Sequence, residues 1–228
     1  MLSPLQERVP HIVFELAESD DFALAGGAAL IVRGEVDRRT HDLDFFGPSA
    51  AAVNRLVPAA EQALVSHGLQ VTRVIDHPGF ARLLVNDGDD QTEIDFGSDA
   101  RLFPVEERLG IRVLSGEELA VDKLLALFGR AEARDFVDLL AVAERYGLNQ
   151  LLDLAAEKDR GFDPGVFAEM LNTIDRLPRT AFPLDEAHFE ALQVAVSTWK
   201  ERALDYARER ERIRGISHDH GPDLGFGR

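Results

Sequence analysis

Two aspartates separated by a single residue, Asp42 and Asp44, constrain the fold of this chain more than any other feature. They lie in the segment 40–46, where apolar and polar residues alternate as on a β-strand. Residues i and i+2 of a strand point to the same face, so the two carboxylates stand side by side while Leu43 and Phe45 face a core. Like charges this close repel each other, and a divalent cation relieves that repulsion. The pair predicts a metal-dependent nucleotide site, and the alternative is an ordinary pair of acids on an exposed strand.

A glycine pair, Gly26–Gly27, stands before this strand, between an apolar segment at 22–25 and a short helical one at 28–33. Glycine lets the backbone approach a ligand closely, and the N-terminus of a helix attracts phosphate. A third acid, Asp95, lies in a strand at 92–96 that follows a hairpin turn at 86–89. If that strand lies beside the first, the three aspartates Asp42, Asp44 and Asp95 are placed to hold two metal ions.

The distribution of patterns along the chain predicts an α+β protein. Strands and hairpins fill the part before about Phe103, and helical periodicity fills the part after it, beginning with a capping-box pattern at Ser115 and Glu118. We therefore expect a mixed α/β domain over 1–103 and a helical domain over 104–214 that packs on it. The glycine-rich end, 215–228, has little to bury and is expected to be disordered.

The first helices of the second half carry a row of charges: Lys123, Arg130, Arg134 and Asp138. In one continuous helix these side chains fall within roughly 80° of each other. Such a face is suited to a triphosphate, and the alternative is a surface salt-bridge ladder. Lys123 has apolar neighbours in sequence, and a lysine at the edge of a core usually has a partner or a function.

The composition limits which functions fit. The chain has 25 basic and 41 acidic residues, a net charge of −16, which argues against extensive wrapping of nucleic acid. A local patch can still act, because salt screens surface charges within about 8–10 Å. The candidate patch consists of Arg33, Arg38, Arg39, Arg73 and Arg82. Cysteine is absent and no apolar run is long enough to span a membrane, so a cytoplasmic protein is expected.

Four motifs in this order resemble the AbiEii/MenT-type nucleotidyltransferase toxins, relatives of the DNA polymerase β superfamily. They are Leu24-Ala-Gly-Gly-Ala-Ala-Leu30, Arg39-Thr-His-Asp-Leu-Asp-Phe45, Glu93-Ile-Asp-Phe96, and the stretch from Lys123 through Arg130 and Arg134 to Asp138. The resemblance covers roughly residues 22–146. It implies a polymerase-β-like nucleotidyltransferase sheet followed by a helical part, with Mg²⁺ or Mn²⁺ as cofactor, an NTP as co-substrate and an antitoxin as partner. Some characterised members add nucleotides to the 3′ end of tRNA.

The resemblance also implies roles for individual residues. Gly26 and Gly27 form the phosphate-side loop, Asp42 and Asp44 bind metal, and Asp95 takes the third-carboxylate position, from which it would accept the proton of the acceptor. Lys123 contacts the nucleotide phosphates, with Arg130, Arg134 and Asp138 completing the downstream motif. Arg33, Arg38 and Arg39 are candidates for contacts with the acceptor, or form a solvated loop. The superfamily's Gly-Ser is Gly-Gly here, so a serine hydroxyl is missing.

Two other functions remain open from the sequence. The acceptor of the nucleotide is tRNA, or else a protein hydroxyl or a small cationic molecule such as an aminoglycoside, which the acidic surface would suit. A catalytically silent nucleotide-binding module is the third alternative, although the presence of Asp42, Asp44 and Lys123 speaks against it.

Overall fold

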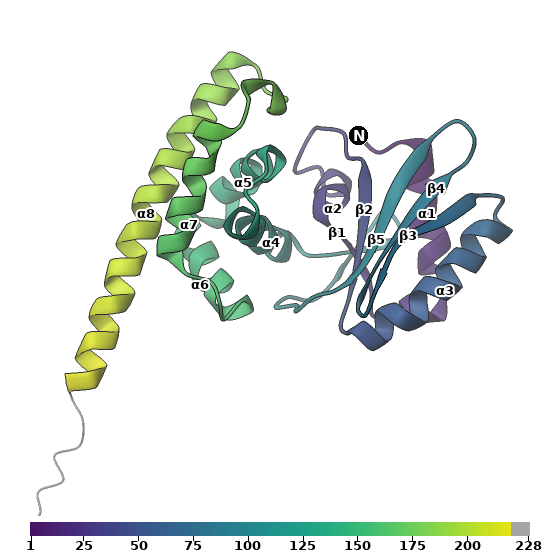
Figure 1. The fold of residues 1–228 in the computed structure, drawn as a ribbon, viewed down its shortest axis with the longest axis horizontal. Coiled ribbons are helices and arrows are strands. Elements are labelled where there is room, and N and C mark those ends of the chain that lie inside the picture. Colours follow the sequence, from purple (N-terminus) through teal and green to yellow (C-terminus); the bar gives the residue numbers. More distant parts are fainter. Residues whose placement is uncertain (220–228) are drawn as a thin grey trace, which may run out of the picture. The chain divides into compact units, whose positions relative to one another are not determined.

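The structure, a computed structural model, describes residues 1–219, with side chains up to Arg212. The chain divides into two compact units, one formed by Met1–Lys123 and the other beginning at Leu124 (Figure 1). We call them the sheet unit and the helical unit. Of the expected disordered tail, residues 215–219 instead continue the last helix, and residues 220–228 lie outside the described part of the chain.

The sheet unit is built on a seven-stranded sheet with the order β3-β4-β5-β2-β1-β7-β6 (Figure 1). Its central pairing, β2 with β5, is parallel, as is that of β1 with β7, and the other neighbours are antiparallel. The strands are β1 (Ala23–Ala25), β2 (Asp42–Gly47), β3 (Gln70–His77), β4 (Phe80–Asn86), β5 (Gln91–Ser98), β6 (Glu106–Arg108) and β7 (Ile111–Val113). The mixed sheet confirms the predicted fold class.

Helices cover one face of this sheet and leave the other to the paired aspartates. Leu43 and Phe45 are fully buried. The Phe45 ring centroid lies 5.4 Å from that of Phe14, at the end of helix α1 (Pro4–Phe14), and 5.3 Å from that of Phe96. Helix α3 (Ala50–Ser66) packs against β3, β4 and β5, and a short 3₁₀ turn, η1 (Ala17–Ser19), follows α1. The strand alternation predicted for 40–46 therefore separates a core face from a carboxylate face.

The sheet extends further along the chain than the sequence predicted. Strands β6 and β7 form a hairpin around Leu109 and Gly110, which both have positive φ (50° and 76°), as a two-residue type I′ loop requires. Leucine is an unusual residue for such a loop, so the hairpin gave no sequence signal. Because β7 pairs with β1, the unit ends at Lys123 and not near the expected boundary at 103/104.

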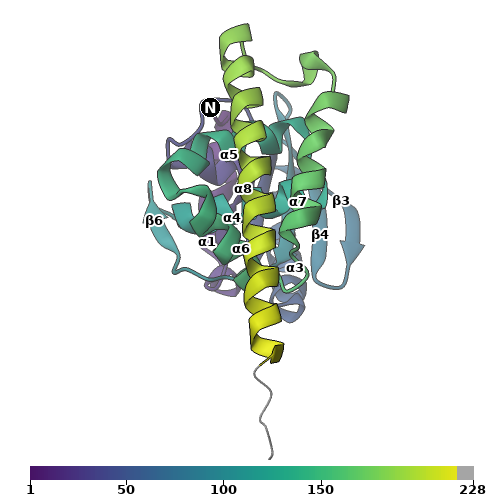
Figure 2. The ribbon, with the colours of Figure 1, turned by 90° about the vertical axis from the view of Figure 1, so that its left-hand side faces the viewer.

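The helical unit consists of helices and short 3₁₀ turns. Helix α4 (Gly116–Gly129) starts in the sheet unit and ends in this one. The remaining elements are α5 (Ala133–Tyr146), α6 (Leu148–Lys158), α7 (Pro164–Met170), η2 (Leu171–Arg176), η3 (Arg179–Ala181) and α8 (Glu186–Asp219). Helices α5, α6 and α7 all contact α8 (Figure 2). Among residues 1–219, no helix combines the length and apolar character that crossing a membrane requires.

Candidate active site

The paired aspartates stand on β2 directly beside the glycine corner. Asp44 is the register partner of Ala25, the last residue of β1, and Gly26 begins helix α2 (Gly26–Val32) with a φ of +60°. A Cβ added to Gly26 would lie only 1.9 Å from Oδ2 of Asp44. The Asp44 carboxylate therefore occupies the space of the missing side chain, which explains why glycine is needed here. The sequence prediction that Gly26 and Asp44 belong to one site agrees with this contact.

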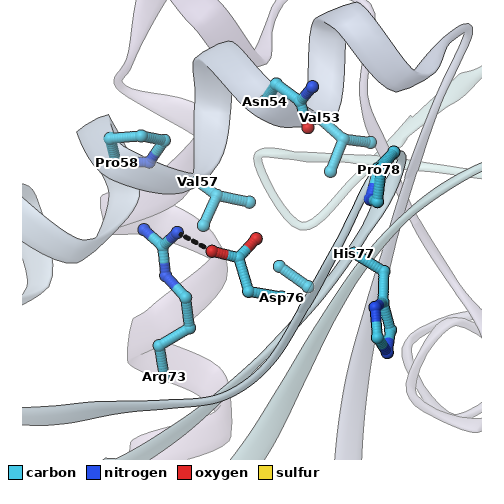
Figure 3. A pocket seen from close by; sticks show the side chains of 9 residues that line it. Val53, Asn54, Val57, Pro58, Arg73, Asp76, His77 and Pro78 are labelled. Atoms are coloured by element: carbon cyan, nitrogen blue, oxygen red, sulfur yellow. Dashed lines mark hydrogen bonds and ion pairs between the residues drawn. The ribbon is translucent and has the colours of Figure 1, made fainter.

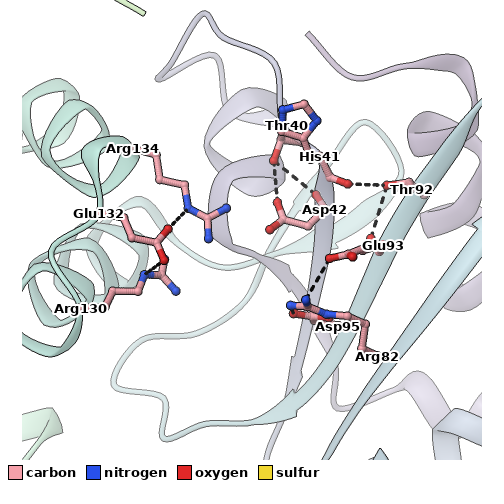
Figure 4. A network of polar contacts seen from close by, with 10 residues as sticks. All are labelled: Thr40, His41, Asp42, Arg82, Thr92, Glu93, Asp95, Arg130, Glu132 and Arg134. Atoms are coloured by element: carbon pink, nitrogen blue, oxygen red, sulfur yellow. Dashed lines mark hydrogen bonds and ion pairs between the residues drawn. The ribbon is translucent and has the colours of Figure 1, made fainter. Parts of the chain in front are cut away.

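Asp42 is oriented by a short polar network. The hydroxyl of Thr40 donates a hydrogen bond of 2.8 Å to Oδ1 of Asp42 (Figure 4). The buried Gln6 amide donates to the Thr40 carbonyl (3.1 Å) and to the hydroxyl of Thr92 (3.2 Å), so helix α1 and strand β5 fix the start of β2. Neither Gln6 nor Thr40 was identified as important from the sequence, because both act through contacts that only the folded sheet creates.

Strand β5 brings two more carboxylates to the same face. The parallel register places Asp95 opposite Asp44 and Glu93 opposite Asp42. Residues two apart on a strand share a face, and register partners on neighbouring strands lie about 5 Å apart. Asp42, Asp44, Glu93 and Asp95 thus form a block of four acids, which we call the carboxylate block. The sequence predicted Asp95 and missed Glu93, although their i, i+2 spacing repeats that of the first pair.

A cation from β4 pairs with the two acids of β5. Arg82 Nε and Nη2 each lie 2.6 Å from a different oxygen of Asp95, and Arg82 Nη1 lies 3.0 Å from Glu93 Oε2 (Figure 4). Its hydrogen bonds to Asp95 hold the pKa of Arg82 above its ordinary value, with further contributions from the charges of Asp95, Glu93 and Asp42. Arg82 was expected in a patch for RNA phosphates, but it is a partner of the acids.

The remaining arginines of the expected patch do not gather on one surface. Arg33 has only 6% of its side chain exposed and pairs with Glu35 (2.9 Å) and Glu106 (3.0 Å), so its predicted contact with the acceptor is not supported. The pKa of Glu106 is raised by burial, but its hydrogen bonds from Arg33 and Arg108 outweigh this and lower it overall. Arg38 does lie at the glycine corner, because a Cβ on Gly27 would be 2.7 Å from Arg38 Nη2.

Arg39 and Arg73 complete that set. Arg39 is exposed, and its carbonyl accepts a hydrogen bond of 2.9 Å from Arg38 Nη1. Arg73 pairs with Glu61 of α3 and with Asp76 (2.7 Å), beside a cavity of about 430 Å³ between α3 and strands β3 and β4 (Figure 3). Arg73 therefore belongs to the helix-covered face of the sheet, opposite the face of the carboxylate block.

Lys123 lies in α4, within the sheet unit, and is only 6% exposed, as its apolar neighbours predicted. The start of α4 is capped as expected, because the Ser115 hydroxyl accepts a hydrogen bond of 3.1 Å from the Glu118 amide. The Glu118 carboxylate also has partners in another segment of the chain. It accepts hydrogen bonds of 2.8 Å from the amides of Leu102 and Phe103, and so fixes the loop before β6.

Lys123 and Asp138 do not lie on one continuous helix, which was the condition for the shared face considered from the sequence. Helix α4 ends at Gly129 and α5 begins at Ala133, and Ala131 between them has a φ of 50°, which no helix residue adopts. Arg130 donates two hydrogen bonds of 2.9 Å to the fully buried Asp135, whose Oδ2 also accepts from the Glu132 amide.

The other cation of that segment is paired as well. Arg134 Nε lies 2.9 Å from Glu132 Oε2 (Figure 4), and Asp138 is fully buried in α5. Arg130 and Arg134 therefore form ion pairs with acids of their own segment, Asp135 and Glu132.

Two acids of the carboxylate block have the chemistry that a divalent cation needs. Mg²⁺ prefers oxygen ligands and is commonly held by one or two carboxylates together with substrate phosphates. Asp42 and Asp44 meet this need, since both are half-buried on one face and Asp44 lies against the glycine corner. Among the residues that the structure describes, no three His, Asp or Glu side chains are arranged to hold a metal ion by themselves. The fit is therefore to a cation that Asp42 and Asp44 hold and that keeps coordination positions open for a substrate.

Solved structures with this fold define its class. MenT4, a nucleotidyltransferase toxin from Mycobacterium tuberculosis, superposes with a TM-score of 0.57 at 16% identity, covering 92% of this chain and 89% of that one. JHP933 from Helicobacter pylori gives 0.55 at 20% identity and covers 96% and 100% of the two chains. A putative nucleotidyltransferase from H. pylori gives 0.55 at 18%, covering 89% and 95%. The fold is thus one that nucleotidyltransferase toxins share.

The chain belongs to the AbiEii family. The family described as "Nucleotidyl transferase AbiEii toxin, Type IV TA system" matches residues 12–223, nearly the whole chain. No curated protein matches this chain. The resemblance found in the sequence motifs is confirmed, and membership places the chain among nucleotidyltransferase toxins of a type IV toxin–antitoxin system and implies an antitoxin partner.

Proposed function

We propose that this chain transfers a nucleotidyl group from an NTP to the 3′ end of tRNA, and that this transfer is its toxic activity. The observation that carries the proposal is the contact between the Asp44 carboxylate and the backbone at Gly26, beside Asp42. It joins two acids to a glycine corner at the start of a helix, the combination that nucleotide phosphates and their cation require. Family membership supports the reaction class.

In the proposed reaction, an oxygen of the acceptor hydroxyl forms a bond to the α-phosphorus of the NTP. The bond from that phosphorus to the bridging oxygen breaks, pyrophosphate leaves, and the hydroxyl proton passes to water. Asp42 and Asp44 would hold the divalent cation, Mg²⁺ or Mn²⁺, which supplies charge stabilisation for the phosphates when bound. Thr40 and Gln6 keep Asp42 oriented, and Gly26 and Gly27 leave room for the phosphates at the start of α2.

Three cationic residues have proposed roles towards the substrates. Arg38, at the glycine corner, is the candidate for a phosphate contact, and exposed Arg39 is the candidate for the acceptor. Lys123 is assigned to the leaving pyrophosphate, as its motif implies, and a nearly buried ammonium is a strong electrostatic partner for a departing anion. Arg130, Arg134 and Asp138 are proposed to contribute to the nucleotide site, as their motif implies. The ion pairs of the two arginines assign them a structural function as well.

The test is transfer of label from each of the four α-³²P-labelled NTPs to total tRNA in the presence of Mg²⁺. The wild type is compared with Asp44→Asn and with Asp21→Asn, a control that alters an exposed aspartate with no part in the site. We expect labelling of tRNA that falls at least about 10³-fold in Asp44→Asn, because several kcal/mol of charge stabilisation are lost. The control should behave as the wild type.

Two results would contradict the proposal. If no NTP gave Asp44-dependent labelling of any RNA, tRNA would not be the acceptor, and intact-mass analysis after NTP exposure would then detect transfer to protein or to a small molecule. If calorimetry with Mg²⁺ present showed no binding of any NTP, the transfer reaction itself would be excluded.

A further inference from the structure

Three side chains from three adjacent strands form a row across the open face of the sheet. Asp44 on β2 is the register partner of Asp95 on β5, and Asp95 is the register partner of Arg82 on β4. Arg82 also reaches Glu93, the next acid along β5. The carboxylate block therefore has four negative charges with one guanidinium at its β4 side, and that guanidinium stands beside the third of the three aspartates predicted to bind metal.

The contact between Arg82 and Asp95 has the strongest geometry available to such a pair. Two parallel N–H groups of Arg82 meet the two oxygens of Asp95 at 2.6 Å, a bidentate arrangement with a fixed direction. The Asp95 side chain is only 10% exposed, so little water competes for it. A second cation at Asp95 would have to approach a carboxylate whose charge is already balanced, and it would be repelled by the guanidinium at short range.

We propose that Arg82 is a positioning residue that keeps Asp95 out of cation coordination, so that the free chain binds one divalent cation, through Asp42 and Asp44. The inference rests on the cation of the proposed function. It assigns Asp95 to the support of the block in place of the roles of third ligand and proton acceptor that its motif implied. Removing Arg82 takes one positive charge away from the block and frees both oxygens of Asp95, which creates a second cation position.

The experiment is a titration of the full chain with Mn²⁺ alone, without nucleotide, followed by the electron paramagnetic resonance signal of free Mn²⁺. We expect one bound Mn²⁺ in the wild type and two in Arg82→Gln. Arg82→Lys keeps the charge and should remain at one. Asp95→Asn should change the Mn²⁺ affinity by less than the roughly 10-fold that losing a supporting contact of a metal ligand commonly costs, whereas Asp44→Asn should weaken it by more than that.

The matched control is Arg73→Gln. Arg73 is also a strand arginine held by two carboxylates, Glu61 and Asp76, but it lies on the helix-covered face, so its loss should leave the Mn²⁺ titration unchanged. A general effect of removing an ion-paired arginine from this sheet would appear in both variants.

The proposal is overturned if Asp95→Asn weakens Mn²⁺ binding as much as Asp44→Asn does, because Asp95 would then be a ligand. It is equally overturned if Arg82→Gln leaves the number of bound ions unchanged. Should Arg82→Gln fail to fold, as judged by circular dichroism, the Asp95→Asn comparison still decides the question. The Mn²⁺ readout needs neither NTP nor tRNA, so failure of the proposed transfer reaction would show separately, as absence of RNA labelling.

Discussion

The charged residues of the sheet unit and those of the helical unit serve opposite purposes. On the open sheet face, four acids stand close together, and the two on β5 share Arg82, an arrangement in which like charges repel each other. At the junction of α4 and α5, by contrast, Arg130 and Asp135 form a complete pair, and Asp135 also caps the backbone at Glu132. A cluster of like charges indicates a binding site, whereas a complete ion pair such as Arg130–Asp135 indicates a structural contact.

Among variants that leave the acids themselves intact, the largest effect should come from closing the glycine corner. In Gly26→Ala, the new methyl group would overlap Asp44 Oδ2 at 1.9 Å and displace the carboxylate, so we expect transfer activity to fall about 10²-fold, as misplacement by about 1 Å typically does. Gly34→Ala is the matched control, because Gly34 also has a positive φ, of +71°, but no atom within 4 Å of the added Cβ.

Both glycine variants should lose about 1–2 kcal/mol of stability from the strained φ alone, measured by urea unfolding. Only Gly26→Ala should lose activity beyond that. Equal activity in the two variants would mean that the glycine corner does not position Asp44. It would also contradict the functional role assigned to the charges of the sheet unit.

The second prediction compares an acid from each unit. Asp135→Ala should lower the free energy of unfolding by about 1–3 kcal/mol, because it removes a helix cap and leaves Arg130 without this partner. Asp44→Ala should leave it unchanged or raise it, since it relieves repulsion within the carboxylate block.

Urea unfolding in the absence of divalent cations measures both values by circular dichroism. The fluorescence of Trp199, the single tryptophan of the chain, follows the helical unit by itself. Similar losses in both variants would contradict the distinction between the charges of the carboxylate block and those that stabilise the α4–α5 junction.

The smallest effect concerns a titration within the helical unit. Burial, together with a hydrogen bond to Asp153 and the negative charge of that carboxylate, raises the pKa of Tyr206 to about 12. The neutral phenol is therefore favoured by folding, and its contribution to stability is complete below the ordinary pKa of 10 and disappears as the pH rises through about 12.

Absorbance at 295 nm should show this transition in the wild type and lack it in Tyr206→Phe. Because Tyr146 also absorbs there, the readout is the difference between the wild type and Tyr206→Phe, and a difference centred near pH 10 would show that α6 and α8 do not hold the hydroxyl in the way the structure indicates.

Much of the sheet could be predicted because strands repeat every two residues. That period placed Asp42 and Asp44 together, set Leu43 and Phe45 in the core, and marked Asp95 as an acid on the same kind of face. The roles of Glu93 and Arg82 depend on which residues lie opposite each other across strands. The turn after Asn86 contains the information for the pairing of Arg82 with Asp95, since a hairpin turn fixes the register of its strands.

The helical unit was harder to predict for a physical reason. An argument about which side chains share a helix face holds only while the helix continues, and one residue with positive φ, Ala131, ends that continuity. The acids at 135 and 138 look like surface charges in the sequence, yet both are fully buried. Their burial depends on partners in the folded chain, which no periodicity reveals.

The parallel pairing of β2 with β5 has a consequence for how the protein folds. It joins residues that the β3–β4 hairpin and helix α3 separate in the chain, so it is a non-local contact that forms slowly compared with a hairpin. Asp42, Asp44 and the glycine corner can come together early through β1 and β2, whereas Glu93, Asp95 and Arg82 arrive as one hairpin. A newly synthesised chain would therefore acquire its charge-balancing arginine and the two acids it balances in the same late step.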